Sequence, residues 1–90
     1  MSDYLWNKTL AYESLLKSAV DAVERHTLEE GELGFECLEM AEAYLTDGQH
    51  FLQENDLPDA LAAFSYGHGW LDAGVRLGVL TVSDTEPFTI

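Results

Sequence analysis

Basic residues are scarce in this chain, and it has neither a cysteine pair nor a long hydrophobic run. Seventeen acidic residues outweigh the four basic ones, Lys8, Lys17, Arg25 and Arg76, so the formal net charge is −13. A surface this negative repels phosphate groups, so we expect no nucleic-acid partner and no anionic membrane partner. The single cysteine, Cys37, excludes an internal disulfide and a cysteine-based zinc cluster.

The hydrophobic content is ordinary, but no apolar stretch is long enough to cross a bilayer. The first residues, MSDYLWNK, lack the basic and apolar regions of a secretory signal. Together with the lone cysteine, these absences predict a cytoplasmic protein. The length of 90 residues predicts a single domain, residues 1–90, with a core of modest size.

The acidic residues occur in every segment and are not gathered in one tail. Dense carboxylates with little lysine keep a protein hydrated in concentrated salt, so this distribution favours a halophilic protein. An acidic face for a basic partner is the alternative. The Debye length is ~10 Å at 0.1 M salt and ~3 Å at 1 M, so self-repulsion is weakly screened in dilute buffer. We therefore expect helicity to fall when salt is removed.

Apolar residues recur at helical spacing over three segments, about residues 3–25, 33–55 and 57–80. Asp56 is a good N-cap, and Pro58 suits the first turn of the third helix. An acidic, glycine-containing stretch separates the first two segments and predicts a loop, whereas residues 81–90 lose the helical pattern and are interpreted as a C-terminal tail. Short connections favour antiparallel neighbours, so the predicted fold is an all-α, up-and-down three-helix bundle.

The third segment has two apolar faces with small residues between them. Each glycine inside a helix costs about 1 kcal/mol relative to alanine, so Gly67, Gly69, Gly74 and Gly78 need an explanation. Close approach of a neighbouring backbone is the favoured one, and a groove left open for a ligand or partner is the alternative. The pattern predicts a central helix that packs on more than one side.

Two groups of residues are candidates for a structural or binding role. Asp72 and Arg76 are four residues apart on the third helix, and in an antiparallel pair of helices Arg76 would also reach Asp47. We expect a network of these three residues that sets helix register; recognition of a small anionic ligand by Arg76 is the alternative. The second group is aromatic, and its members are Tyr44, Phe51, Tyr66 and Trp70. These residues form either part of the core or a partner surface. The second alternative is considered because tyrosine and tryptophan dominate interface hot spots.

Catalytic and metal-binding patterns are weak. Asp47 and His50 resemble half of a helix-bundle di-iron site, but no second acidic-x-x-His pair occurs. His68 and Asp72 are spaced to orient an imidazole as a general base, yet no serine or cysteine nucleophile falls beside them by spacing. We expect no catalytic residue, no metal and no cofactor.

A motif in the third helix resembles a known family. The run G-W-L-D-A-G-x-R-L-G spans residues 69–78, and it follows residues with the same resemblance: Ala41, Tyr44, Asp47, Phe51, Asp56, Ala60, Leu61, Ala62, Ala63 and Tyr66. Residues 36–80 are similar to the archaeal domain of unknown function 357 family, whereas the first helix is only generically similar. Asn55 stands where that family is expected to have glycine, although asparagine tolerates positive φ. The resemblance implies a small archaeal cytoplasmic protein with an up-and-down three-helix bundle, and no activity, cofactor or partner. Combined with the acidity, it points to a haloarchaeon.

These observations support two main hypotheses. The first is a non-enzymatic protein-interaction module that binds a protein partner or forms a homodimer, through the first helix or through the face of Tyr66, Trp70 and Leu77. The second is a small-ligand or nucleotide-binding protein that uses a cluster between helices two and three: Tyr44, Asp47, Tyr66, Asp72 and Arg76. An enzyme with His68 as its base is a weaker third. One open cavity lined by the cluster would favour the second hypothesis, and a closed, packed cluster the first.

Overall fold

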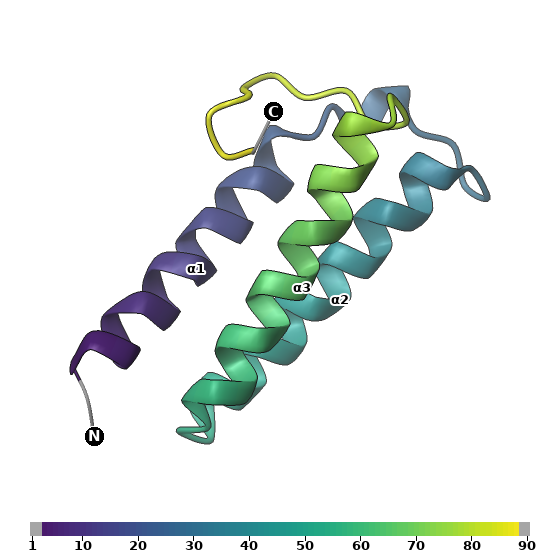
Figure 1. Cartoon of the computed structure of the whole chain (residues 1–90). Helices are drawn as coiled ribbons and strands as arrows, with labels where there is room; N and C mark the ends of the chain where they lie inside the picture. The colour runs from purple at the N-terminus through teal and green to yellow at the C-terminus, as the bar shows by residue number, and fades with distance from the viewer. Residues whose placement is uncertain (1–2, 89–90) are drawn as a thin grey trace.

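Three helices make up the bundle in a computed structural model that describes residues 3–88 (Figure 1). They are α1 (Asp3–Ala22), α2 (Leu33–Gln53) and α3 (Leu57–Arg76), and a short 3₁₀ helix, η1 (Arg25–Thr27), lies between α1 and α2. α2 and α3 form a tight antiparallel pair, and α3 also packs against α1. The predicted all-α, up-and-down three-helix bundle is confirmed. Residues 1–2 of the predicted domain and residues 89–90 of the predicted tail lie outside the described residues.

The turn between α2 and α3 follows from two residues. Asn55 adopts a positive φ of 61°, and the backbone N–H of Asp56 donates to the carbonyl of Phe51 at 2.9 Å. This is the Schellman arrangement, in which a left-handed residue ends a helix and satisfies its last carbonyls. The side chain of Asp56 then accepts from the N–H of Asp59 at 3.2 Å, which confirms the predicted N-cap, and Pro58 sits in the first turn.

α3 ends at Arg76 and does not continue to Leu80 as the sequence pattern suggested. Gly78 has a positive φ of 78°, and the N–H of Val79 donates to the carbonyl of Gly74 at 2.9 Å. A second Schellman turn therefore closes this helix. Because glycine takes up the left-handed conformation at no steric cost, Gly78 ends α3 and is not an interior helical residue.

The chain after α3 is non-helical in its described part, as the loss of the helical pattern predicted, and it is packed onto the bundle. Residues 79–88, yellow in Figure 1, cross over the ends of α3 and α1. Val82 forms an isolated antiparallel bridge with Val23, and the N–H of Ser83 donates to the carbonyl of Ala22 at 2.8 Å. Phe88 is only 7 % exposed. These bonds also explain why α1 ends at Ala22 and not near residue 25.

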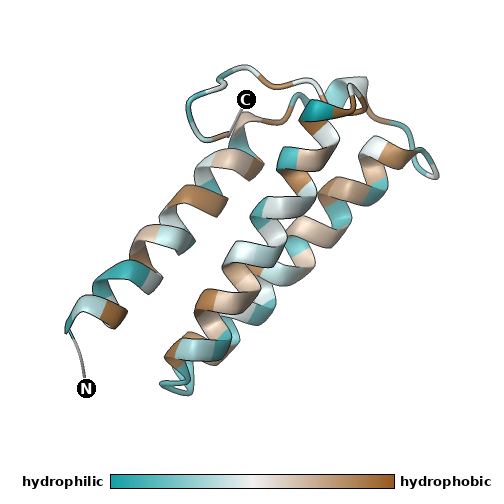
Figure 2. Cartoon of the chain, in the orientation of Figure 1, coloured by the Kyte–Doolittle hydropathy of each residue, from teal (hydrophilic) through white to brown (hydrophobic). Residues whose placement is uncertain are grey.

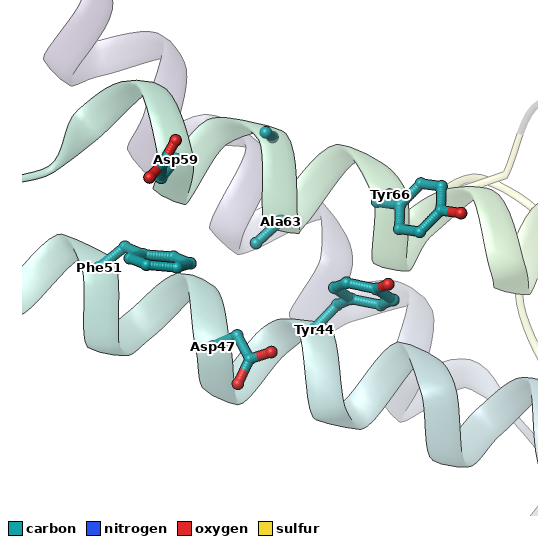
Figure 3. A pocket seen from close by; sticks show the side chains of 7 residues that line it. Tyr44, Asp47, Phe51, Asp59, Ala63 and Tyr66 are labelled. Atoms are coloured by element: carbon teal, nitrogen blue, oxygen red, sulfur yellow. The ribbon is translucent and has the colours of Figure 1, made fainter.

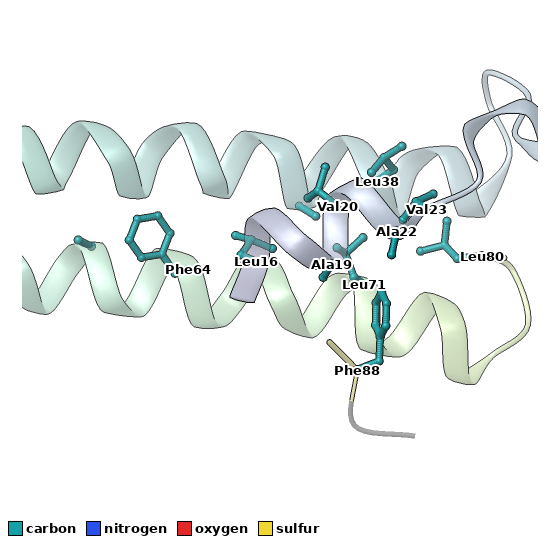
Figure 4. Close-up of a cluster of buried hydrophobic side chains, with 12 residues drawn as sticks. Leu16, Ala19, Val20, Ala22, Val23, Leu38, Phe64, Leu71, Leu80 and Phe88 are labelled. Atoms are coloured by element: carbon teal, nitrogen blue, oxygen red, sulfur yellow. The ribbon is translucent and has the colours of Figure 1, made fainter. Parts of the chain in front are cut away.

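Most of the core lies toward one end of the bundle (Figure 4). We call this the closed end, where α1 and α3 end, α2 begins and residues 79–88 cover the helices. Its buried apolar side chains are Leu16, Ala19, Val20, Ala22, Val23, Leu38, Leu71, Leu80 and Phe88. Figure 2 shows hydrophobic residues in brown recurring along all three helices, but burial is uneven.

The opposite end, which we call the open end, contains the first turns of α1 and the turn of residues 54–56. Its buried apolar side chains are fewer, and the largest are Leu57 and Phe64. Tyr4 and Trp6 on α1 are exposed, Trp6 by 41 %. The bundle is thus well covered at one end and partly uncovered at the other.

Close approach explains two of the glycines in α3. A Cβ on Gly67 would lie 3.0 Å from the Cβ of Tyr44, and one on Gly74 would lie 2.9 Å from the Cγ of Leu80. Gly69 differs from both, because a Cβ there would meet nothing within 4 Å. Packing inside the chain therefore accounts for Gly67 and Gly74 and not for Gly69.

Candidate functional site

An open groove of about 350 Å³ lies between α2 and α3 in the half of the bundle toward the open end (Figure 3). We call it the α2–α3 groove. Its lining residues are Tyr44, Asp47 and Phe51 from α2, and Asp59, Ala62, Ala63 and Tyr66 from α3. Helical spacing places the three α2 residues along one edge of their helix, and the antiparallel arrangement sets the α3 residues opposite them.

The number of residues that separate a position from Asn55 decides which residues of α2 and α3 face each other. Phe51 and Asp59 are each four residues from Asn55, and Tyr44 and Tyr66 are each eleven residues from it. In a tight antiparallel turn, residues at equal distances from the turn lie at the same level. Figure 3 shows Asp59 opposite Phe51 and Tyr66 beside Tyr44.

Two tyrosines form the wall of the groove farthest from the turn. The rings of Tyr44 and Tyr66 are 4.8 Å apart between centroids and inclined by 82°, an edge-to-face contact. Tyr44 is half-buried, while Tyr66 is 60 % exposed. Tyr66 is therefore oriented by its neighbour and still exposed at the surface.

The charged groups of the groove are all negative. Asp47 and Asp59 are exposed and lie on opposite walls (Figure 3). The pKa of the Asp59 carboxyl is raised by its hydrogen bond with Asp56 and by the negative charge of that residue. The ion pairs formed within residues 3–88 involve other carboxylates, those of Glu42, Glu54 and Asp72. In the described chain, no basic side chain offsets the charge of Asp47 or Asp59.

A second hollow of about 310 Å³ continues the surface along α3. It is lined by Tyr66, Gly69, Trp70 and Ala73, so it shares Tyr66 with the α2–α3 groove. Trp70 is half-buried and packs against the core, whereas Leu77 beyond it is 76 % exposed. The predicted face of Tyr66, Trp70 and Leu77 thus lies at the surface, with Trp70 partly anchored.

The predicted network of Asp47, Asp72 and Arg76 is wrong. Asp47 is eight residues before Asn55, and Arg76 is 21 residues after it. Along the antiparallel pair of helices, Arg76 therefore lies thirteen residues farther from the turn than Asp47. At 1.5 Å per residue this separates them by about 20 Å along the helices. Arg76 is exposed in the last turn of α3 and forms no ion pair with any residue of the described chain.

His68 is the residue that holds Asp72. The Nδ1 atom of His68 lies 3.0 Å from Oδ2 of Asp72, and its Nε2 atom lies 2.6 Å from the carbonyl oxygen of Pro87. The imidazole is only 9 % exposed and bridges α3 to residues 79–88. Both ring nitrogens are thus engaged in structure, which leaves neither open to a substrate as a general base requires.

Cys37 and the histidines are not gathered into one cluster within residues 3–88. Residues 3–88 contain no group of three or more His, Cys, Asp or Glu side chains that could hold a metal ion. The Nε2 atom of His50 lies 3.5 Å from a carboxylate oxygen of Glu54. Cys37 is half-buried, and desolvation, together with the charge of Glu36, raises the pKa of its thiol. A thiol of raised pKa is less reactive as a nucleophile.

Sequence reasoning did not place Asp59 in the candidate site. A carboxylate at this position is already explained by the first turn of α3, where it complements the helix dipole. The available signal was the length of the turn, because counting outward from Asn55 pairs Asp59 with Phe51. The candidates Tyr44, Asp47 and Tyr66 come together, Trp70 adjoins them, and Asp72 and Arg76 lie elsewhere.

Comparison with known proteins extends the resemblance toward the N-terminus. Within residues 3–88, no helix is both long and apolar enough to cross a membrane. Curated proteins and solved structures give no match. A family model described as "Protein of unknown function (DUF357)" matches residues 11–80, which include α2, α3 and most of α1. This match covers well over half of the chain, and the protein therefore belongs to the DUF357 family.

Proposed function

We propose that this protein is a non-enzymatic protein-interaction module whose docking surface is the α2–α3 groove and the adjoining hollow at Tyr66 and Trp70. The observation that carries the proposal is the state of Tyr66, which is held against Tyr44 and is nevertheless 60 % exposed. Partly anchored tyrosine and tryptophan rings are the residues that contribute most to binding at protein interfaces.

Gly69 supports the same surface. A glycine inside a helix costs about 1 kcal/mol relative to alanine, and within residues 3–88 no atom beyond its chain neighbours and the adjacent helical backbone lies within 4 Å of where a Cβ on Gly69 would be. It lies in the hollow between Tyr66 and Trp70. A partner backbone that approaches α3 at this point would make use of the missing side chain.

The alternative, a small-ligand or nucleotide-binding protein, has less support. It required one cluster with Arg76 as the anion-binding group, but Arg76 lies about 20 Å along the helices from Asp47. The groove itself contains two carboxylates, which repel phosphate. The proposed setting is the cytoplasm of a haloarchaeon, because the dispersed negative charge suits concentrated salt.

Comparative affinity capture tests the docking surface. Tagged wild-type protein, Tyr66→Ser and the control Leu33→Ser are incubated with a haloarchaeal lysate at native salt. Leu33 is an exposed leucine at the first residue of α2, far from the groove, so the control removes a similar amount of exposed apolar surface. A protein captured by the wild type and by Leu33→Ser, but lost with Tyr66→Ser, supports the proposal. Equal capture by all three forms contradicts it.

A homodimer is distinguished by measuring the mass of the three forms in solution. A dimer that becomes a monomer only with Tyr66→Ser identifies the partner as a second copy of this chain. If Tyr66→Ser affects neither mass nor capture, this face is not the docking surface.

A further inference from the structure

The α2–α3 groove combines two kinds of group that recognise an organic cation. Its walls contain the aromatic rings of Tyr44, Phe51 and Tyr66, and its two sides carry the carboxylates of Asp47 and Asp59. Aromatic faces attract ammonium and guanidinium groups, and carboxylates form charge-assisted hydrogen bonds with them. An anion would be repelled here, and an apolar occupant would desolvate the carboxylates without pairing them.

Two tyrosines on α1 lie close to an ammonium group of their own chain. On α1 the Nζ atom of Lys8 lies 5.6 Å from the ring centroid of Tyr4 and 5.5 Å from that of Tyr12. It also donates to the hydroxyl of Tyr4 at 3.4 Å. These tyrosines have an ammonium group from their own chain, within the range of about 6 Å at which the attraction is significant.

The tyrosines of the groove have no such group. Of the other basic residues, Arg25 pairs with Glu42 at 2.8 Å, Arg76 lies toward the closed end, and Lys17 is exposed on α1. Asp56 and Asp59 are in contact at the edge of the groove, so their negative charges lie close together without a basic side chain from residues 3–88 beside them. A cation placed there would reverse the effect that raises the pKa of Asp59.

From this contrast, and resting on the proposed function, we infer that the α2–α3 groove receives a lysine or arginine side chain of the partner polypeptide. Its charged end lies between Asp47 and Asp59 and against the rings of Tyr44 and Tyr66. This chain has only four basic residues, and two of them, Lys8 and Arg25, are engaged internally. A different protein is therefore the expected source.

Titration with small probes tests the inference directly. Nα-acetyl-arginine amide and its neutral isostere, Nα-acetyl-citrulline amide, are added to the protein while the ring resonances of Tyr44, Phe51 and Tyr66 are followed by NMR. We expect the arginine probe to shift these resonances and to bind about ten-fold more tightly than the citrulline probe. Binding of the arginine probe should weaken as potassium chloride is raised.

Variants with matched charge locate the site. Asp47→Asn and Asp59→Asn should each weaken the arginine probe about three-fold, and together about ten-fold. Asp21→Asn, an exposed change on α1 with the same effect on net charge, should leave binding unchanged. Tyr66→Leu should weaken binding about three-fold, while Tyr66→Phe retains the ring and the affinity. Circular dichroism of each variant establishes that the fold is kept.

Three results would overturn the inference. The first is equal binding of the citrulline and arginine probes, and the second is equal weakening by Asp21→Asn and Asp47→Asn, since a general acidic field would explain it. The third is binding of free spermidine that is about a hundred-fold tighter than that of the arginine probe, which would make the ligand a free polyamine. If the arginine probe fails while Tyr66→Ser still abolishes capture, only the cation inference falls. If capture is unaffected but the probe binds, the docking proposal falls, and with it the assignment of the cation to a partner polypeptide.

Discussion

The closed end and the open end of this bundle use similar residues to different effect. At the closed end, Leu80 and Phe88 cover the helices and are themselves buried. At the open end, Tyr4 and Trp6 are exposed on α1, and the α2–α3 groove leaves Tyr66 uncovered. The aromatic ring of Phe88 completes the core at the closed end, whereas at the open end Phe64 is buried but Tyr4, Trp6 and Tyr66 remain at the surface.

The difference suggests that one end of this 90-residue chain provides stability and the other provides the binding surface. A chain this short buries a limited core, and here the core is concentrated where residues 79–88 fold back. The groove then lies on two helices that are packed into this core at the closed end. Binding groups mounted on rigid helices keep their geometry better than groups on loops. The stable end therefore supports the end that we propose to bind.

Removal of salt should produce the largest difference between the two ends. With a net charge of −13, self-repulsion is weakly screened in dilute buffer, so helicity measured by circular dichroism should fall markedly along a decreasing potassium chloride series. Amide hydrogen exchange should show the first turns of α1 losing protection before residues 16–22, because the open end is less covered. A flat response in both measurements would contradict the prediction.

Truncating one aromatic side chain at each end compares the two directly. Phe88→Ala should lower the free energy of unfolding by about 3 kcal/mol, because the buried ring would leave a cavity. Trp6→Ala removes a larger side chain that is 41 % exposed, and should cost less than about 1 kcal/mol. Urea denaturation of both variants at one salt concentration measures the difference. Equal losses would mean that the two ends are equally packed.

Two glycines distinguish internal packing from an open surface. Gly48 on α2 lies against the ring of Phe64, which a Cβ would overlap, so Gly48→Ala should destabilise the protein by about 2 kcal/mol. Gly69 meets nothing, so Gly69→Ala should stabilise it by about 1 kcal/mol through helix propensity. Thermal unfolding of the two variants, which are identical in composition, measures both. Stabilisation by Gly48→Ala would show that Phe64 can move aside.

The smallest effect is expected at the two Schellman turns. Asn55 and Gly78 adopt similar positive φ angles, 61° and 78°, one at each end of the bundle. Asn55→Gly should stabilise the protein by about 0.5 kcal/mol, and Gly78→Asn should destabilise it by a similar amount, because glycine reaches the left-handed region without steric cost. Denaturation of the single variants and of the double variant should show effects that cancel. A loss of stability with Asn55→Gly would mean that the asparagine side chain has another role.

Much of the α2–α3 pair could be predicted from the sequence. Asp56 and Pro58 identified the start of α3, and asparagine at position 55 was compatible with the left-handed conformation that the turn has. Counting outward from that turn pairs Tyr44 with Tyr66, so the centre of the groove follows from local signals alone. The predicted network of Asp47 and Arg76 is wrong because the prediction did not take into account the register that the turn imposes.

The helical class, the number of helices and the start of α3 follow from the amino-acid sequence, because helical periodicity and caps are local properties. Only the tertiary structure decided that residues 79–88 belong to the core, since an irregular segment buries Phe88 without any periodic pattern. It also decided that His68, and not Arg76, holds Asp72, because the partner of His68 on the other side is the carbonyl of Pro87, nineteen residues away. Contacts between distant segments depend on where the chain returns in space, and spacing along one helix does not encode that.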